Sequence, residues 1–136
     1  MFNFSSLVLD MRSFHPPTSQ IDTYWQIYMS NVDPLIKILH TPSFISHIFT
    51  AKHDPGLLSK PVEAAIFAIY HFVIVSMTPK EVRECFMEER AELLSKYRFA
   101  TEQALARANF LSTRNLMTLQ AFAQFLVSIA LAPQTW

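Results

Sequence analysis

The chain has 136 residues, of which 51% are hydrophobic, 13% aromatic and 16% charged, so it is long enough for one packed domain and too apolar to be disordered. Eleven basic residues balance eleven acidic ones, which leaves no net field to attract nucleic acid or anionic lipid, and we expect no direct nucleic-acid binding by this chain alone. The single cysteine, Cys85, excludes an internal disulfide and any zinc site built on cysteine pairs.

Glycine and proline usage predicts the fold class. The chain contains one glycine and eight prolines. Strand connections depend on glycine for positive φ angles, whereas helix interiors avoid it, and proline is typical of helix starts and stops. We therefore predict an all-α fold, a single helical domain of about six helices, with a leader or linker over residues 1–18 and the helical domain over residues 19–132.

Three helices are predicted in the first half of the chain. Apolar residues recur at steps of three and four over Ile21–Val32, which indicates one helical stripe. Asp33 followed by Pro34 is a helix-start signal, because aspartate caps free N–H groups and proline suits the first helical position. A short second helix is expected to run to about His40, and Pro42 then opens a third.

The second half is predicted to hold the most apolar and the most charged helices. Residues 52–60 are expected to form a loop before a helix over Val62–Met77 that is buried on all sides. Thr78, Pro79 and Glu81 combine a capping box with proline at the first helical position. The helical region Lys80–Arg107 carries twelve of the 22 charged residues, so it must have a wide solvated face. The last helix is predicted over Asn115–Leu131.

No segment is predicted to span a membrane. Residues 64–77 are uncharged but too short, because a spanning helix needs about 20 apolar residues. Residues 115–136 are long enough, but their amides and hydroxyls, such as those of Gln124 and Ser128, would need partners in hydrocarbon. Residues 1–9 lack the basic region and the cleavage site of a signal peptide, so we expect an intracellular protein.

The histidines, the cysteine and the carboxylates give no catalytic or metal-binding pattern. His40 and His47 are seven residues apart, but Pro42 separates them, and no other cluster has metal-ligand spacing. Cys85 is expected to be a buried or half-buried, inert thiol, because the neighbouring Glu84 disfavours a thiolate.

Glu84, Glu88 and Glu92 place carboxylates at one-turn spacing, and a solvated, salt-bridged face explains them. One glycine also excludes a phosphate-cradling loop. We predict no catalytic, cofactor-binding or metal-binding residue, no cofactor and no enzymatic activity.

A small pocket is the one binding site that the residue types allow. Five side chains combine an apolar body with a polar tip and could line a cavity for a small-molecule effector between helices: Trp25, Tyr28, Tyr70, His71 and Tyr97. The alternative, which we favour, is that these side chains simply pack the core.

Several short sequence motifs, taken in order, resemble the fungal-specific transcription factor domain, which is the middle homology region of regulators with a zinc binuclear cluster. The motifs are His15-Pro16; Trp25 with Tyr28; Asn31-Val32-Asp33-Pro34-Leu35 with Lys37, His40 and Pro42; Glu63-Ala64-Ala65-Ile66-Phe67-Ala68-Ile69-Tyr70; Leu93-Leu94 with Tyr97-Arg98; Glu102-Gln103-Ala104-Leu105 with Ala108; and Leu119-Gln120-Ala121. They extend from residue 15 to about residue 130 and resemble the first half of that domain only.

The resemblance implies a non-catalytic, all-α regulatory module in a nuclear protein that controls fungal metabolic or secondary-metabolite genes; without the family, the expected location is cytoplasmic. The family reads DNA through six cysteines, which this chain lacks. We therefore expect a truncated, regulator-like protein that acts through a protein partner or by self-association, because helices 62–77 and 115–131 would expose apolar surface. The alternatives are a fragment of a longer product and a small helical enzyme or ligand-binding protein of fungal secondary metabolism.

Overall fold

The computed structural model describes residues 11–111 and 113–132. Those residues contain six α-helices and no strand, which confirms the predicted all-α fold. The elements are a 3-10 helix (Met11–Phe14), α1 (Thr18–Ile27), a π-helical turn (Tyr28–Val32), α2 (Thr41–His53), a second 3-10 helix (Pro55–Leu57), α3 (Lys60–Val75), α4 (Pro79–Phe86), α5 (Arg90–Arg107) and α6 (Leu116–Leu131).

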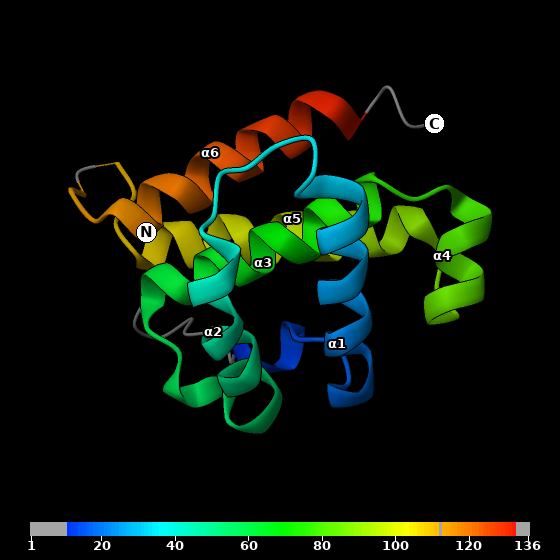
Figure 1. The fold of residues 1–136 in the computed structure, drawn as a ribbon, viewed down its shortest axis with the longest axis horizontal. Helices are drawn as coiled ribbons and strands as arrows, with labels where there is room; N and C mark the ends of the chain where they lie inside the picture. The colour runs from blue at the N-terminus through cyan, green and yellow to red at the C-terminus, as the bar shows by residue number, and fades with distance from the viewer. Residues whose placement is uncertain (1–10, 112, 133–136) are drawn as a thin grey trace, which may run out of the picture.

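Helix α3 is the centre of the domain. It packs along its length against α5 and α6, and α1 and the π-helical turn contact it as well. In Figure 1, α6 crosses the top, α3 and α5 run through the middle, and α1 and α2 stand below them. Every residue from Val62 to Val75 is buried, as the uninterrupted apolar run predicts, so the expectation that this helix exposes apolar surface is wrong. Helices α1, α5 and α6 therefore all pack directly against this one.

Helix α1 buries the stripe that the sequence predicts. Ile21, Tyr24, Tyr28 and Val32 are at most 2% exposed, whereas Trp25 is half-buried. The last turn widens to a π-helix, since the backbone N–H of Asp33 donates to the carbonyl of Tyr28, five residues back.

The predicted helix from Pro34 to about His40 is wrong. Residues 33–35 form a turn and residues 36–40 are irregular. A single short helix between two prolines has little stability of its own, and two tertiary interactions stabilise the irregular path instead. Leu39 is buried in the core, and the Ile38 carbonyl accepts a hydrogen bond from the Gln120 side chain of α6 at 2.9 Å.

The charged region 80–107 is two helices rather than one. The capping box is confirmed: the Thr78 hydroxyl accepts from the backbone N–H of Glu81 at 3.2 Å, and the Glu81 carboxylate accepts from that of Thr78 at 2.8 Å. Helix α4 then ends after two turns because Met87 adopts a left-handed conformation, with φ at 57°. Helix α5 begins three residues later at Arg90.

The ends of the chain are described only in part. Residues 1–10 of the predicted leader, together with residue 112 and residues 133–136, lie outside the described residues. The described remainder of that segment is packed: Met11 is buried, and its 3-10 helix contacts α5. Among residues 11–111 and 113–132, no helix has the length and hydropathy needed to cross a bilayer.

Candidate functional site

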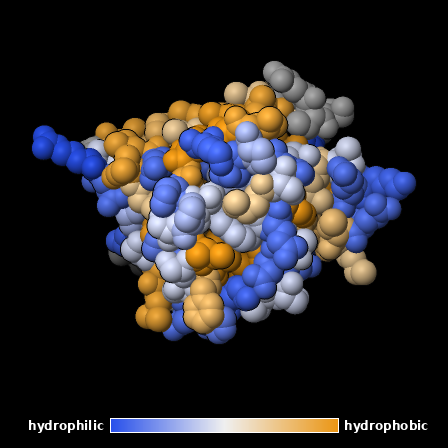
Figure 2. Space-filling view, in the orientation of Figure 1, coloured by the Kyte–Doolittle hydropathy of each residue, from blue (hydrophilic) through white to orange (hydrophobic). Residues whose placement is uncertain are grey.

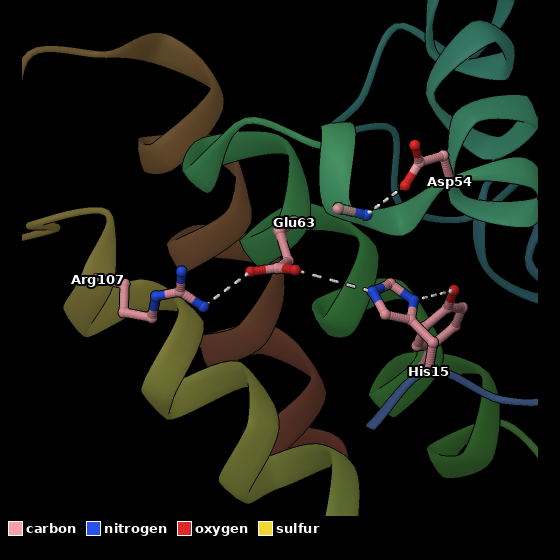
Figure 3. Close-up of polar contacts among 6 residues, drawn as sticks. His15, Asp54, Glu63 and Arg107 are labelled. Atoms are coloured by element: carbon pink, nitrogen blue, oxygen red, sulfur yellow. Dashed lines mark hydrogen bonds and ion pairs between the residues drawn. The ribbon is translucent and has the colours of Figure 1, made fainter. Parts of the chain in front are cut away.

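Residues from three parts of the chain form a polar cluster around the buried carboxylate of Glu63 (Figure 3). Glu63 lies in the first turn of α3, and its Oε1 is 3.4 Å from Nη1 of Arg107 in the last turn of α5. Its Oε2 is 3.9 Å from Nε2 of His15, and His15 Nδ1 is 3.1 Å from the hydroxyl of Tyr70. The cluster joins the segment before α1 to α3 and α5.

Burial controls the chemistry of the Tyr70 hydroxyl. Desolvation, together with the nearby Tyr97 and Glu63, raises the pKa of Tyr70 well above its ordinary value. Tyr70 is therefore a neutral hydroxyl that exchanges a hydrogen bond with His15. The imidazole of His15 also packs against the ring of Phe67, at 4.6 Å between centroids. The arrangement positions the N-terminal segment on the domain and buries a carboxylate beside two basic side chains.

Tyrosine side chains continue this cluster toward α4. The hydroxyls of Tyr24 and Tyr97 lie 3.0 Å apart, and the Tyr24 ring stacks on Phe86 at 4.3 Å. Burial raises the pKa of both tyrosines, so both remain protonated. Their mutual hydrogen bond satisfies two hydroxyls that the core would otherwise leave without partners.

Helix α6 presents its polar residues to the core. Nδ1 of His71 lies 2.7 Å from Oγ of Ser128, and the Ser128 hydroxyl donates to the Phe125 carbonyl. His71 Nδ1 is therefore the donor, and the imidazole is neutral. Burial, followed by the charges of Arg98 and Arg90, lowers the pKa of His71 to about 4.

A second polar contact ties α6 to the end of the α1 segment. The Tyr28 hydroxyl donates to Oε1 of Gln124 at 2.8 Å, and both side chains are at most 1% exposed. Replacing Tyr28 with phenylalanine should lower the free energy of unfolding by about 1–3 kcal/mol, because the buried amide oxygen loses its donor. Urea titration followed by circular dichroism measures this change.

The double variant Tyr28→Phe/Gln124→Met is the matched control. Removing both polar partners should recover most of the lost stability, because no unsatisfied buried group remains. Equal stability of the wild type and the single variant would show that the hydrogen bond does not hold α6.

The five residues of the predicted pocket fall into three neighbourhoods. Tyr70 and Tyr97 come together at 5.4 Å between ring centroids, and Trp25 stacks on Tyr28 at 5.7 Å. His71 contacts α6 through Ser128 and Phe125. These ring contacts and hydrogen bonds do not test for a cavity shared by the five side chains, so the pocket stays a prediction.

Two surface hollows are lined by other residues. The larger, of about 640 Å³, lies where the π-helical turn, the C-terminal end of α3 and Leu131 meet, and Asn31 there donates to Ser76 at 3.2 Å. The smaller, of about 230 Å³, lies between α2 and the start of α6 and includes His40 and His47. Among the described residues no group of three or more metal-ligating side chains is assembled.

The predictions of a buried or half-buried Cys85 and of a shared helix face for Glu84 and Glu88 are wrong. Cys85 is exposed rather than buried or half-buried, because only Val82 and Phe86 of the short helix α4 face the core. Glu84 and Glu88 do not share a helix face, because Glu88 lies in the linker between α4 and α5. In that linker Glu89 is 3.6 Å from Arg83.

Arg90 is a buried structural side chain that the sequence does not predict. It is 3% exposed, and its guanidinium donates to the carbonyls of Met77 at 2.8 Å, Val75 at 3.2 Å and Ile74 at 3.3 Å. Burial lowers its pKa from the ordinary value. No local pattern marks it, because an arginine that opens a charged helix is ordinarily exposed.

Comparisons with known proteins connect this helical domain to transcription regulators. No model of a known protein family matches the chain, and no solved structure matches it. An aurofusarin cluster transcription factor of Gibberella zeae is 46% identical over 105 residues, covering 77% of this chain and 16% of that protein. The transcriptional regulator AacuB of Aspergillus aculeatus is 34% identical over 121 residues, covering 89% of this chain and 16% of that protein.

A third relative carries the zinc-cluster name. The C6 finger domain transcription factor adaR of Aspergillus niger is 37% identical over 107 residues, covering 76% of this chain and 14% of that protein. The chain thus spans 14–16% of the length of these curated relatives. Their names support a transcription-regulator-like protein linked to secondary-metabolite clusters, and they give no support to the alternative of a small enzyme.

Proposed function

We propose that this chain is a non-catalytic, helical regulatory module of a fungal secondary-metabolite transcription regulator, equivalent to the first half of the fungal-specific transcription factor domain. It works in the nucleus, through protein contacts and without binding DNA directly. The balanced charge of the chain supports this last point, because a DNA-binding surface depends on excess positive charge. A small-molecule effector and the pocket of Trp25, Tyr28, Tyr70, His71 and Tyr97 belong to the same proposal.

One observation carries the proposal. His15 belongs to one motif of the regulator-like pattern, Glu63 and Tyr70 belong to another about 50 residues further along the chain, and the two motifs meet in one buried cluster. Because these residues contact one another in the folded chain, their match to the pattern indicates a shared fold rather than a chance match of short motifs. The identities of 34–46% over most of the chain add independent support.

A segment exchange tests the proposed function. In the aurofusarin cluster transcription factor of Gibberella zeae, the segment that matches this chain is removed. The corresponding 105 residues of this chain are put in its place. We expect the chimera to maintain cluster gene transcripts close to the level of the parent, because the two segments share one core. Reverse-transcription PCR measures the transcripts, and immunoblotting confirms equal protein levels.

A control chimera carries an unrelated all-α domain of similar length in the same position. This control should fail to support transcription. An exchange chimera that performs no better than the control at equal protein level would refute the proposed function.

A further inference from the structure

Helix α6 buries three polar side chains together with Ala121 and Phe125, and every exposed side chain of this helix is apolar. Its buried side chains include Thr118, Gln124 and Ser128, whereas Leu116, Leu119 and Leu126 are 68%, 44% and 49% exposed. No residue of the helix is charged. Figure 2 shows a hydrophobic band along the top of the molecule, where α6 runs in Figure 1. An exposed apolar band of this kind marks an interaction surface.

The exposed residues follow a heptad. Leu116, Leu119, Ala123, Leu126 and Ala130 are all exposed, and their spacing alternates between three and four residues. That spacing is the a/d seam of a coiled coil, in which side chains of one helix insert between those of another. Half-buried apolar side chains, Phe122 and Ile129 among them, flank the seam, so no flanking charge repels a second apolar helix.

The seam is complementary to a second copy of itself. In an antiparallel pair each a position lies opposite a d position of the other helix. Leu119 then faces Ala130, and Ala123 faces Leu126, so each layer between residues 119 and 130 sets a large side chain against a small one. Such alternation fills the interface and lets the two backbones approach closely. A parallel pair would instead set leucine against leucine and leave the alanine layers underfilled.

We propose that two copies of this chain associate through an antiparallel α6 pair, with Leu119, Ala123, Leu126 and Ala130 forming the seam. The pairing is isologous, because the same surface serves both copies. Antiparallel helices also place each helix N-terminus beside the C-terminus of the other, which is the favourable arrangement of their dipoles. This inference rests on the proposed function, in that it names the partner of the interaction module.

Sedimentation equilibrium of the full chain tests the association. The wild type should show twice the mass of 15.7 kDa. Leu126→Glu should raise the dissociation constant by about tenfold or more, because the seam would enclose an unpaired carboxylate. Leu57→Glu is the matched control, since Leu57 is 74% exposed outside α6 and its variant should remain dimeric. Circular dichroism checks that both variants stay folded.

Cysteine cross-linking tests the antiparallel register in a Cys85→Ser background. Copies carrying Leu119→Cys should form a mixed disulfide with copies carrying Ala130→Cys, at a rate above that of a Leu57→Cys control. Copies carrying Leu119→Cys alone should not cross-link, because antiparallel packing separates the two sites by roughly 16 Å along the axis, and a disulfide spans about 7 Å at most.

Two results would overturn the proposal. One is a wild-type monomer throughout the micromolar range, and the other is preferential self-cross-linking of Leu119→Cys, which requires a parallel pair. The segment exchange in the aurofusarin cluster factor reads out transcription and needs no α6 pair of this chain. A failed dimer test beside a successful exchange therefore rejects the dimer and leaves the proposed function in place.

Discussion

Replacing Arg90 with methionine should lower the free energy of unfolding by about 3 kcal/mol. The guanidinium donates to three carbonyls at the C-terminal end of α3 and the turn after it. A hydrogen bond from a charged donor contributes about 1.5–3 kcal/mol, and a cation at a helix C-terminus adds a favourable interaction with the dipole. Some of the freed carbonyls regain water, so the expected loss is smaller than the sum over three bonds. Urea unfolding at pH 7, monitored by circular dichroism, measures it.

Two further variants isolate the role of the several hydrogen bonds that the Arg90 guanidinium donates. Arg90→Lys keeps the charge but brings one nitrogen where the guanidinium brings several, so its stability should fall between those of the wild type and Arg90→Met. Arg83→Met removes a half-exposed arginine from α4 and should change stability by less than about 0.5 kcal/mol. Equal effects of the two methionine variants would contradict the capping role of Arg90.

The second large effect is a loss of stability on acidification that depends on His71. The folded state holds the pKa of His71 at about 4, below its ordinary value of 6.5. Between these two pH values the unfolded chain binds a proton that the folded chain does not. The free energy of unfolding therefore falls as the pH falls through this window, by about 3 kcal/mol between pH 7 and pH 4. Well above pH 6.5 both states are unprotonated at this group and its contribution is constant.

The His71→Gln variant should lack this part of the pH dependence, because the glutamine side chain does not titrate. The difference in unfolding free energy between the wild type and His71→Gln should shift by about 3 kcal/mol in favour of the variant between pH 7 and pH 4. His53→Gln, at an exposed histidine, should keep the wild-type dependence. A constant difference between the wild type and His71→Gln across the whole range would refute the assignment.

Both effects concern how α3 holds its neighbours, and this determines the surface that α6 presents. Arg90 joins the end of α3 to the start of α5 through the carbonyls of Ile74 and Val75. His71 and Tyr28 bind the polar side of α6 through Ser128 and Gln124. Rotating α6 to bury its leucines would leave the Tyr28 hydroxyl and the His71 imidazole without hydrogen-bond partners. An unpaired polar group is costly in a core. The apolar seam therefore faces outward.

The sequence alone predicted the features that depend on neighbours within a few residues. Low glycine content predicted the all-α class, the apolar period predicted the buried stripe of α1, and the capping box at Thr78 predicted the start of α4 to the residue. The apolar run over residues 62–77 predicted the central helix. In each case the deciding interaction lies within one or two helical turns, so it is visible in the order of residues.

Long-range contacts decided the remaining features. The segment after Asp33 is irregular because Gln120, 82 residues away from Ile38, binds its backbone. Arg90 is buried because it meets carbonyls 13–16 residues back along the chain. His15 lies in one motif of the regulator-like pattern and Glu63 and Tyr70 lie in another, and only the fold brings the two motifs into one cluster.

The face of α6 that turns inward shows this division most clearly. Its sequence determined that it is an uncharged helix with both apolar and polar stripes, and simple amphipathicity predicts leucines inside. The tertiary structure decided that polar side chains turn inward together with Phe125 and that three leucines turn outward, because the hydrogen-bonding groups of Tyr28 and His71 lie beneath α6 and need partners. An unsatisfied buried polar group costs more than an exposed leucine, and no pattern within α6 itself carries that information.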